Sequence, residues 1–455
     1  MSGVDRFFGI SAVGSNLRRE IVGGIVTFMT LSYIIFVQPA MLSEVGAPYD
    51  GVLFATCVAS AIACFFMGLF ARYPIALAPA MGHNAFFVYT VCLGLLVAKA
   101  GIDKAEAWKY ALLANFISGV VFLGLSFTRV RRAVMDAVPD SIKYAIAVGI
   151  GLFITLIGLQ YAGIVVPSGA TGITLGNLGS KPAIVSLVGV AVVLALLALR
   201  IPGAILFGII ASTVMASVLG AAPTPEGVVS APPDPSGTLF ALFKVKMSQI
   251  PWAIFIQVLL VFLFLDMFDT VGTLIGVGEQ AGLLKDGKLE RAERALLSDA
   301  VGTVSGTLLG TSTVTSYIES AAGVAYGART GLAAVGVGLL FLASLFFYPL
   351  IKVVGAAVPL KGGFATHPMV APALIVVGAM MFKPVKKIAL DKLEDALPAF
   401  LTIVIIPFTF SITDGIAAGF ISYALFRLVR GKVARKDIAA MVIAAAFVFY
   451  YIIKP

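Results

Sequence analysis

Long apolar runs alternate with short polar segments along almost the whole chain. A helix that crosses the hydrocarbon core of a bilayer needs about 20 predominantly apolar residues. The runs are continuous and rich in Gly, Ala, Leu and Val, whereas a transmembrane β-barrel would show short segments of alternating polarity. The pattern therefore predicts an all-α polytopic membrane protein with about fourteen spans. We place them at 19–42, 51–71, 77–97, 107–127, 141–163, 183–199, 202–221, 251–277, 295–310, 314–328, 331–357, 367–382, 396–411 and 413–453.

The last of these regions is ambiguous, because 413–429 and 437–453 are each long and apolar enough to be a separate span. The segment 222–250 is rich in proline and is predicted to be an ordered outer loop rather than a helix.

Two segments interrupt the apolar pattern at matching positions of the two halves of the chain. Each half begins with a long apolar helix, and residues 74–85 and 310–323 then contain too many polar, Pro or Gly residues for a plain lipid-facing helix. Paired interrupted segments of this kind point to a transporter site, because non-helical backbone at membrane depth must be covered by protein or water. We predict two half-helices, each preceded by a short extended segment, in a seven-plus-seven inverted repeat. The alternative is a pair of kinked packing helices.

Composition agrees with a membrane protein and argues against a nucleic-acid partner. Only 12% of the 455 residues are charged and 60% are hydrophobic, whereas about a quarter of a soluble domain is charged. The net charge of +9 comes from basic residues in the short loops, which is the pattern of cytoplasmic loops. These residues are Arg6, Arg18, Arg19, Arg72, Arg129, Arg131, Arg132, Arg200, those of 285–294, Arg329, Lys383, Lys386 and Lys387. The spacing of Cys and His suits no metal site, and we expect no cofactor.

Two carboxylates lie three residues apart inside an apolar run. Asp266 and Asp269 share one face of the predicted helix, although an acid at the centre of a membrane helix costs roughly 2.5–3.5 kcal/mol. Such a pair indicates that a ligand binds there or that protons move through it. The alternative is that both carboxylates pair with buried structural donors.

Three further polar residues lie in the interrupted segments. Glu319 lies near the start of the second half-helix, where an acid either contacts a ligand or caps the helix. Asn84 is its counterpart in the first half, and an amide that donates and accepts suits a heterocyclic ligand, the alternative being a contact that joins helices. His83 could relay a proton or be a hydrogen-bonded packing histidine.

Two threonines follow Asp269 within about one helical turn. Thr270 and Thr273 either contact a ligand or bond back to the helix. The predicted substrate-binding residues are Asn84, Phe86, Asp269, Thr273 and Glu319, and the candidates for proton coupling are His83, Asp266, Asp269 and Glu319.

At these residues the chain resembles the AzgA-type purine permeases of the nucleobase–cation symporter class, also called the xanthine/uracil permease superfamily. The stretches that carry the resemblance are 23–37, 79–87, 264–273, 311–324 and 407–423, and the likeness covers essentially the whole chain. The family's polar site residues correspond here to Asn84, Asp266, Asp269 and Glu319. Two positions depart from its usual pattern, namely His83, where an apolar residue is usual, and Gln38, where Asn is usual.

The resemblance implies proton-coupled import of purine nucleobases, such as hypoxanthine, guanine, adenine and xanthine, across the plasma (inner) membrane. It also implies an elevator-type mechanism in which a core domain moves past a gate domain. The expected divisions are a cytoplasmic N-terminus at 1–18, core at 19–127 and 251–357, gate at 141–221 and 367–455, and an outer loop at 222–250.

The alternative function is transport of an anion such as sulfate or bicarbonate on the same fold. The three acids at the predicted site argue against a doubly charged anion. The sequence leaves the preferred purine, the proton-carrying acid and a homodimer undecided.

Overall fold

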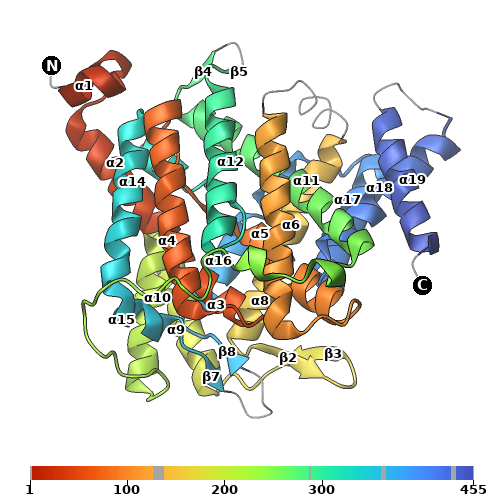
Figure 1. Ribbon diagram of the computed structural model, residues 1–455, viewed down its shortest axis with the longest axis horizontal. Helices are drawn as coiled ribbons and strands as arrows, with labels where there is room; N and C mark the ends of the chain where they lie inside the picture. The colour runs from red at the N-terminus through yellow and green to blue at the C-terminus, as the bar shows by residue number, and fades with distance from the viewer. Residues whose placement is uncertain (1–2, 127–137, 286–287, 360–364, 432–436, 454–455) are drawn as a thin grey trace.

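The computed structural model describes residues 3–126, 138–285, 288–359, 365–431 and 437–453 (Figure 1). The basic cluster predicted at Arg129, Arg131 and Arg132 lies outside the described residues, and so do residues 286 and 287 of the basic loop.

The first half of the chain is a series of helices interrupted by one short strand and one hairpin. Several helices begin at a polar N-cap; for example, the side chains of Asn16 and Asp103 accept hydrogen bonds from Arg19 N and Ala105 N. The elements are α1 (Gly3–Phe8), η1 (Ser11–Val13), α2 (Leu17–Leu31), α3 (Ile34–Ser43), α4 (Tyr49–Phe65), η2 (Phe66–Ala71), β1 (Leu77–Pro79), α5 (Met81–Ala85), η3 (Phe86–Val97), α6 (Lys104–Leu125), α8 (Asp140–Tyr161), β2 (Val165–Ser168), β3 (Gly172–Leu175), α9 (Lys181–Ala198) and α10 (Ala204–Val218).

The second half again has one short strand before a half-helix, and it contains two hairpins. Two short 3₁₀ turns, η4 (Ala241–Lys244) and η5 (Met247–Gln249), precede it in the predicted outer loop. The elements that follow are α11 (Trp252–Gln280), β4 (Leu284–Lys285), β5 (Lys288–Leu289), α12 (Ala292–Leu309), β6 (Val314–Ser316), α13 (Ser320–Ala325), α14 (Gly331–Ser344), η6 (Leu345–Phe347), α15 (Tyr348–Val354), β7 (Val358–Pro359), β8 (Ala365–Thr366), α16 (Ala371–Met380), η7 (Lys383–Lys387), α17 (Leu393–Thr409), α18 (Ile412–Val429) and α19 (Ile438–Ile453).

Among the described residues, eight helices are long and apolar enough to cross a membrane, and three shorter apolar helices accompany them. The ambiguous C-terminal region is two helices, α18 and α19. In Figure 1, α1 and the β4–β5 hairpin lie at one end of the molecule, and the β2–β3 and β7–β8 hairpins lie at the other. The predicted cytoplasmic basic segments at the N-terminus and around β4–β5 are therefore at the same end.

The helices pack in two groups. Helices α2, α4, α6, α11, α12 and α14 contact one another, and α8, α9, α10, α16, α17 and α18 form the second group. The division into a core and a gate domain and their relative movement stay predictions.

A small set of side chains joins the two groups near the predicted outer end. Glu44, which follows α3, accepts hydrogen bonds from the hydroxyls of Tyr89 in η3 and Tyr161 at the end of α8. The Thr90 hydroxyl donates to the carbonyl oxygen of Phe410, between α17 and α18, at 2.7 Å. We call this set, Glu44, Tyr89, Thr90, Tyr161 and Phe410, the outer seam.

The two extended segments of the inverted halves meet in the interior. Strands β1 and β6 are antiparallel, with Leu77 opposite Ser316 and Pro79 opposite Val314, and every residue of both strands is buried. Each strand leads directly into a half-helix, α5 or α13. The predicted half-helices with preceding extended segments are therefore confirmed.

Candidate functional site

The crossing of β1 and β6 sets the position of both half-helix N-termini. The pairing extends beyond the strands, since Ala80 N donates to Thr313 O and Tyr317 N donates to Ala76 O, both at 2.9 Å. The free N–H groups and the positive dipole end of a helix lie at its N-terminus. Because the strands are antiparallel, α5 and α13 begin at opposite ends of this short pair in the protein interior.

Two acids lie at this crossing with accessible carboxylates. The side chain of Asp269, on α11, is 44% exposed, and one of its oxygens is 3.9 Å from Nδ1 of the buried His83. Glu319, the residue before α13, is half-buried. The two acids are close enough to interact electrostatically. Since both carboxylates are reachable, they can accept hydrogen bonds from a ligand.

Glu319 is held by a tyrosine rather than by its own helix. Its side chain makes no capping hydrogen bond to α13, and its Oε1 accepts from the hydroxyl of Tyr33 at 2.8 Å. The ring of Tyr33 lies 6.4 Å from that of Tyr317, whose hydroxyl donates to the carbonyl of Pro79. Two aromatic rings thus stand beside the accessible acids, and the capping alternative for Glu319 loses its support.

Asp266 lies away from this accessible surface. It is 2% exposed, and its carboxyl group neighbours that of Asp299 on α12, which is completely buried. Asp299 accepts from the Thr270 hydroxyl at 2.8 Å and from Ser316 N at 2.9 Å, so it joins α11 and α12 to β6. Thr270 thus serves a structural role in this contact.

Asn84 and Gln38 belong to a buried network between the halves. Gln38 Nε2 donates to the hydroxyls of Thr311 and Ser312 at 2.9 and 3.0 Å, and the Ser312 hydroxyl donates to Oδ1 of Asn84. Asn84 has no exposed surface. In this conformation its amide joins the first half-helix to the segment before β6, which is the helix-joining alternative of the sequence analysis.

The remaining predicted residues are buried. Phe86 packs edge-to-face on Phe262 with ring centroids 5.0 Å apart, and Thr273 is 8% exposed. The structure therefore brings His83, Asp269 and Glu319 together and leaves Asn84, Phe86, Asp266 and Thr273 in the protein interior around them. Whether these four residues contact a ligand stays a prediction.

Sequence reasoning missed Asp299 and Tyr33. Asp299 lies inside the predicted span 295–310, so the cost of a buried acid that identified Asp266 applies to it equally. Tyr33 gives no such signal, because an isolated tyrosine in an apolar run is unremarkable and its partner is distant in the sequence.

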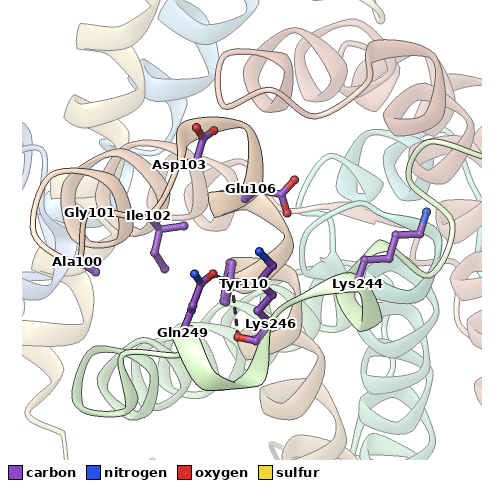
Figure 2. A pocket seen from close by; sticks show the side chains of 9 residues that line it. All are labelled: Ala100, Gly101, Ile102, Asp103, Glu106, Tyr110, Lys244, Lys246 and Gln249. Carbon is purple, nitrogen blue, oxygen red and sulfur yellow. Dashed lines mark hydrogen bonds between the residues drawn. The ribbon is translucent and has the colours of Figure 1, made fainter.

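A separate surface pocket of about 560 Å³ lies at the start of α6 (Figure 2). In Figure 2, Asp103, Glu106 and Tyr110 lie on the segment at the start of α6, and Lys244, Lys246 and Gln249 lie on a second segment that lines the same pocket. None of these residues belongs to the predicted site. They supply control positions of the same residue types away from the half-helices.

Comparisons with known proteins agree with this architecture. A model of a permease family matches residues 18–418. The chain is 42% identical to a guanine/hypoxanthine permease of Bacillus subtilis, with 98% of this chain and 99% of that protein aligned. It is 38% identical to an adenine permease of Escherichia coli, with 98% and 95% aligned.

Solved structures share the fold at low sequence identity. The transmembrane domain of a cyanobacterial bicarbonate transporter matches with a TM-score of 0.60 and 15% identity, over 89% of this chain and 97% of that one. A murine Slc26a9 anion transporter in the inward-facing state matches with a TM-score of 0.64 and 12% identity, over 95% and 72%. These proteins have the seven-plus-seven inverted-repeat fold, so the predicted fold class is confirmed.

Proposed function

The chain belongs to this permease family, and from that membership and the geometry of the site we propose that it imports purine nucleobases together with protons. It is a multi-pass protein of the plasma (inner) membrane and a transporter rather than an enzyme. Hypoxanthine, guanine and adenine are the proposed substrates because the aligned relatives that cover almost the whole chain are permeases for these bases.

One observation carries the proposal: two accessible carboxylates, Asp269 and Glu319, face the same region beside paired half-helix tips. The ring and exocyclic N–H groups of a purine are hydrogen-bond donors, and carboxylates are the strongest acceptors among side chains. The buried rings of Tyr33 and Tyr317 lie beside Glu319 and give it aromatic surroundings.

The coupled proton is proposed to bind among His83, Asp266, Asp269 and Glu319. Adjacent carboxylates shielded from water repel one another when both are charged, so one of the two takes up a proton. Asp266 and Asp299 are both buried and lie on the contacting helices α11 and α12, so a proton on Asp266 would relieve repulsion between them. Asp269, the proposed purine ligand, lies one helical turn from Asp266, so the purine and the proton would bind next to each other.

Transport is proposed to follow from movement of the core past the gate. Half-helix α13 contacts α2 and α11 of the first packing group, and α5 contacts α11 of that group as well as α8 of the second. Asp266 and Asp269 lie on α11 and Glu319 directly precedes α13, so these acids would move with the first group. The outer seam joins the groups in the conformation described here, and it would have to open when the site faces outside.

The anion alternative has weaker support. The anion transporters in the comparison are 12–15% identical to this chain and share its fold, whereas the purine permeases are 38–42% identical along nearly the whole length. Accessible acids also repel an anion.

Uptake of radiolabelled hypoxanthine into cells that express the chain tests the proposal. We expect uptake that unlabelled guanine or adenine inhibits, that sulfate leaves unchanged, and that a protonophore abolishes. Inhibition by sulfate alone would favour the anion function. Purine uptake that the protonophore leaves unchanged would support the proposed substrate and contradict the proposed proton coupling.

A further inference from the structure

Helix α2 contacts the second half-helix segment at three separate levels. At its start, the completely buried Glu20 accepts hydrogen bonds from Arg329 N at 3.0 Å and Thr330 N at 3.2 Å, just beyond α13. A buried carboxylate that receives two backbone N–H groups is a strong, directional anchor. This contact fixes one end of α2 against the chain that carries Glu319.

The middle of α2 lies in close backbone contact with α13. A Cβ added at Gly323 would lie 2.1 Å from Thr27 Oγ1 and 2.3 Å from the Gly23 carbonyl oxygen. Only glycine permits this approach, which is how small residues let membrane helices pack closely. The separation between α2 and α13 is therefore set by backbone atoms and tolerates little change.

The third level is the contact between Tyr33 and Glu319. Helix α2 ends at Leu31 and α3 begins at Ile34, and Tyr33 lies in the short break between them. Its side chain is 2% exposed, and its hydroxyl donates to Glu319 Oε1. The Thr30 hydroxyl lies 3.4 Å from the Glu319 carbonyl oxygen, so the backbone of the same residue is also in contact.

We propose that Tyr33 is a positioning residue for the substrate: its hydroxyl holds one oxygen of Glu319 so that the other oxygen meets the purine in a fixed orientation. The inference rests on the proposed function, because it assigns Glu319 to purine binding. A side chain held by a packed neighbour loses less conformational freedom when the ligand binds, and this raises affinity. Tyr33 itself need not touch the purine.

Tyr33→Phe tests this proposal because it removes the hydroxyl and keeps the ring. Loss of a hydrogen bond to a charged group predicts a KM for hypoxanthine uptake that rises about tenfold or more. Since the hydroxyl acts on binding, Vmax per molecule at the cell surface should stay within about twofold. The matched control is Tyr110→Phe, which removes a hydroxyl 3.3 Å from Gln249 Oε1 in the separate pocket of Figure 2 and should leave both values unchanged.

A change in KM without a change in Vmax distinguishes a positioning role of Tyr33 from an effect on folding. A merely structural tyrosine would lower the amount of active transporter, and so Vmax, with KM unchanged, and this result would overturn the inference. A Tyr33→Phe transporter equal to the wild type in both values would overturn it as well.

A double-mutant cycle shows whether Tyr33 acts through Glu319. Purine binding to the purified full-length protein is measured by calorimetry for the wild type, Tyr33→Phe, Glu319→Ala and the double variant. We expect Tyr33→Phe to have no further effect once the Glu319 side chain is absent; an equal effect in both backgrounds contradicts the inference. If Glu319→Ala leaves no measurable binding, the KM and Vmax result decides. A wild-type protein that binds no purine refutes the proposed function itself.

Discussion

The acids of this protein differ in what surrounds each carboxyl group, and this difference separates binding from structural roles. Asp269 and Glu319 are accessible, whereas Asp299 is fully buried with three hydrogen-bond donors from Thr270 and Ser316. An accessible acid can exchange water for a ligand. A buried and fully bonded acid instead holds its neighbours in place.

Substituting Asp299→Ala should therefore destabilise the protein. The change leaves Ser316 N without its acceptor in the interior, at a cost of about 2 kcal/mol. The measurement is the thermal unfolding midpoint of the purified protein in detergent.

The matched control is the adjacent Ser298→Ala, which removes a buried hydroxyl that donates back to Arg294 O, on its own helix, at 2.9 Å. Equal unfolding temperatures of the two variants would contradict the structural role assigned to Asp299.

At the residue scale, the sequence could locate acids that are costly to place in a membrane, but it could not identify their hydrogen-bond partners. The apolar surroundings of Asp266 and Asp269 made both acids conspicuous. The apolar sequence around them predicts neither the exposure of Asp269 nor the burial of Asp266. Both residues share one helical face, and only tertiary packing distinguishes them. The Tyr33–Glu319 contact joins residues 286 positions apart.

At the element scale, interruption of the apolar pattern was the informative signal. Proline, glycine and hydroxyl residues in 74–85 and 310–323 predicted both half-helices, because such residues need cover by protein or water at membrane depth. The antiparallel pairing of β1 with β6 could not be predicted, since each strand has only three residues and the two are distant in the chain.

The contact between α2 and α13 predicts a sensitive position at Gly323. Gly323→Ala adds a methyl group where Thr27 and the Gly23 backbone leave no space, so α13 must move away and take Glu319 with it. We expect purine affinity to fall about tenfold or more, because loss of the held geometry removes at least one charge-assisted hydrogen bond.

Gly336→Ala on α14 is the control for Gly323→Ala, as an added Cβ there meets nothing within 4 Å. This substitution should leave affinity unchanged and favour the helix slightly. Equal affinities of the two variants for hypoxanthine, measured by calorimetry, would show that the α2–α13 spacing does not position the site.

At the scale of the whole molecule, the two packing groups and the crossing strands explain how one chain can place a polar site inside a membrane. The inverted halves each supply a strand and a half-helix, so the site forms only when both halves meet. Sequence pattern predicted the seven-plus-seven inverted repeat, which the solved structures of the same fold confirm. It left the C-terminal region undecided because 413–453 is apolar throughout except for a short basic segment.

The central claim is that a purine binds to the accessible acids where the half-helices meet. Calorimetric titration of hypoxanthine into the purified wild-type protein, Asp269→Asn, Glu319→Gln and the control Glu106→Gln tests it most directly. Glu106 lines the separate pocket of Figure 2. The account predicts wild-type affinity for the control and at least a tenfold loss for each site variant, the cost of a charge-assisted hydrogen bond. Wild-type affinity in both site variants would contradict it.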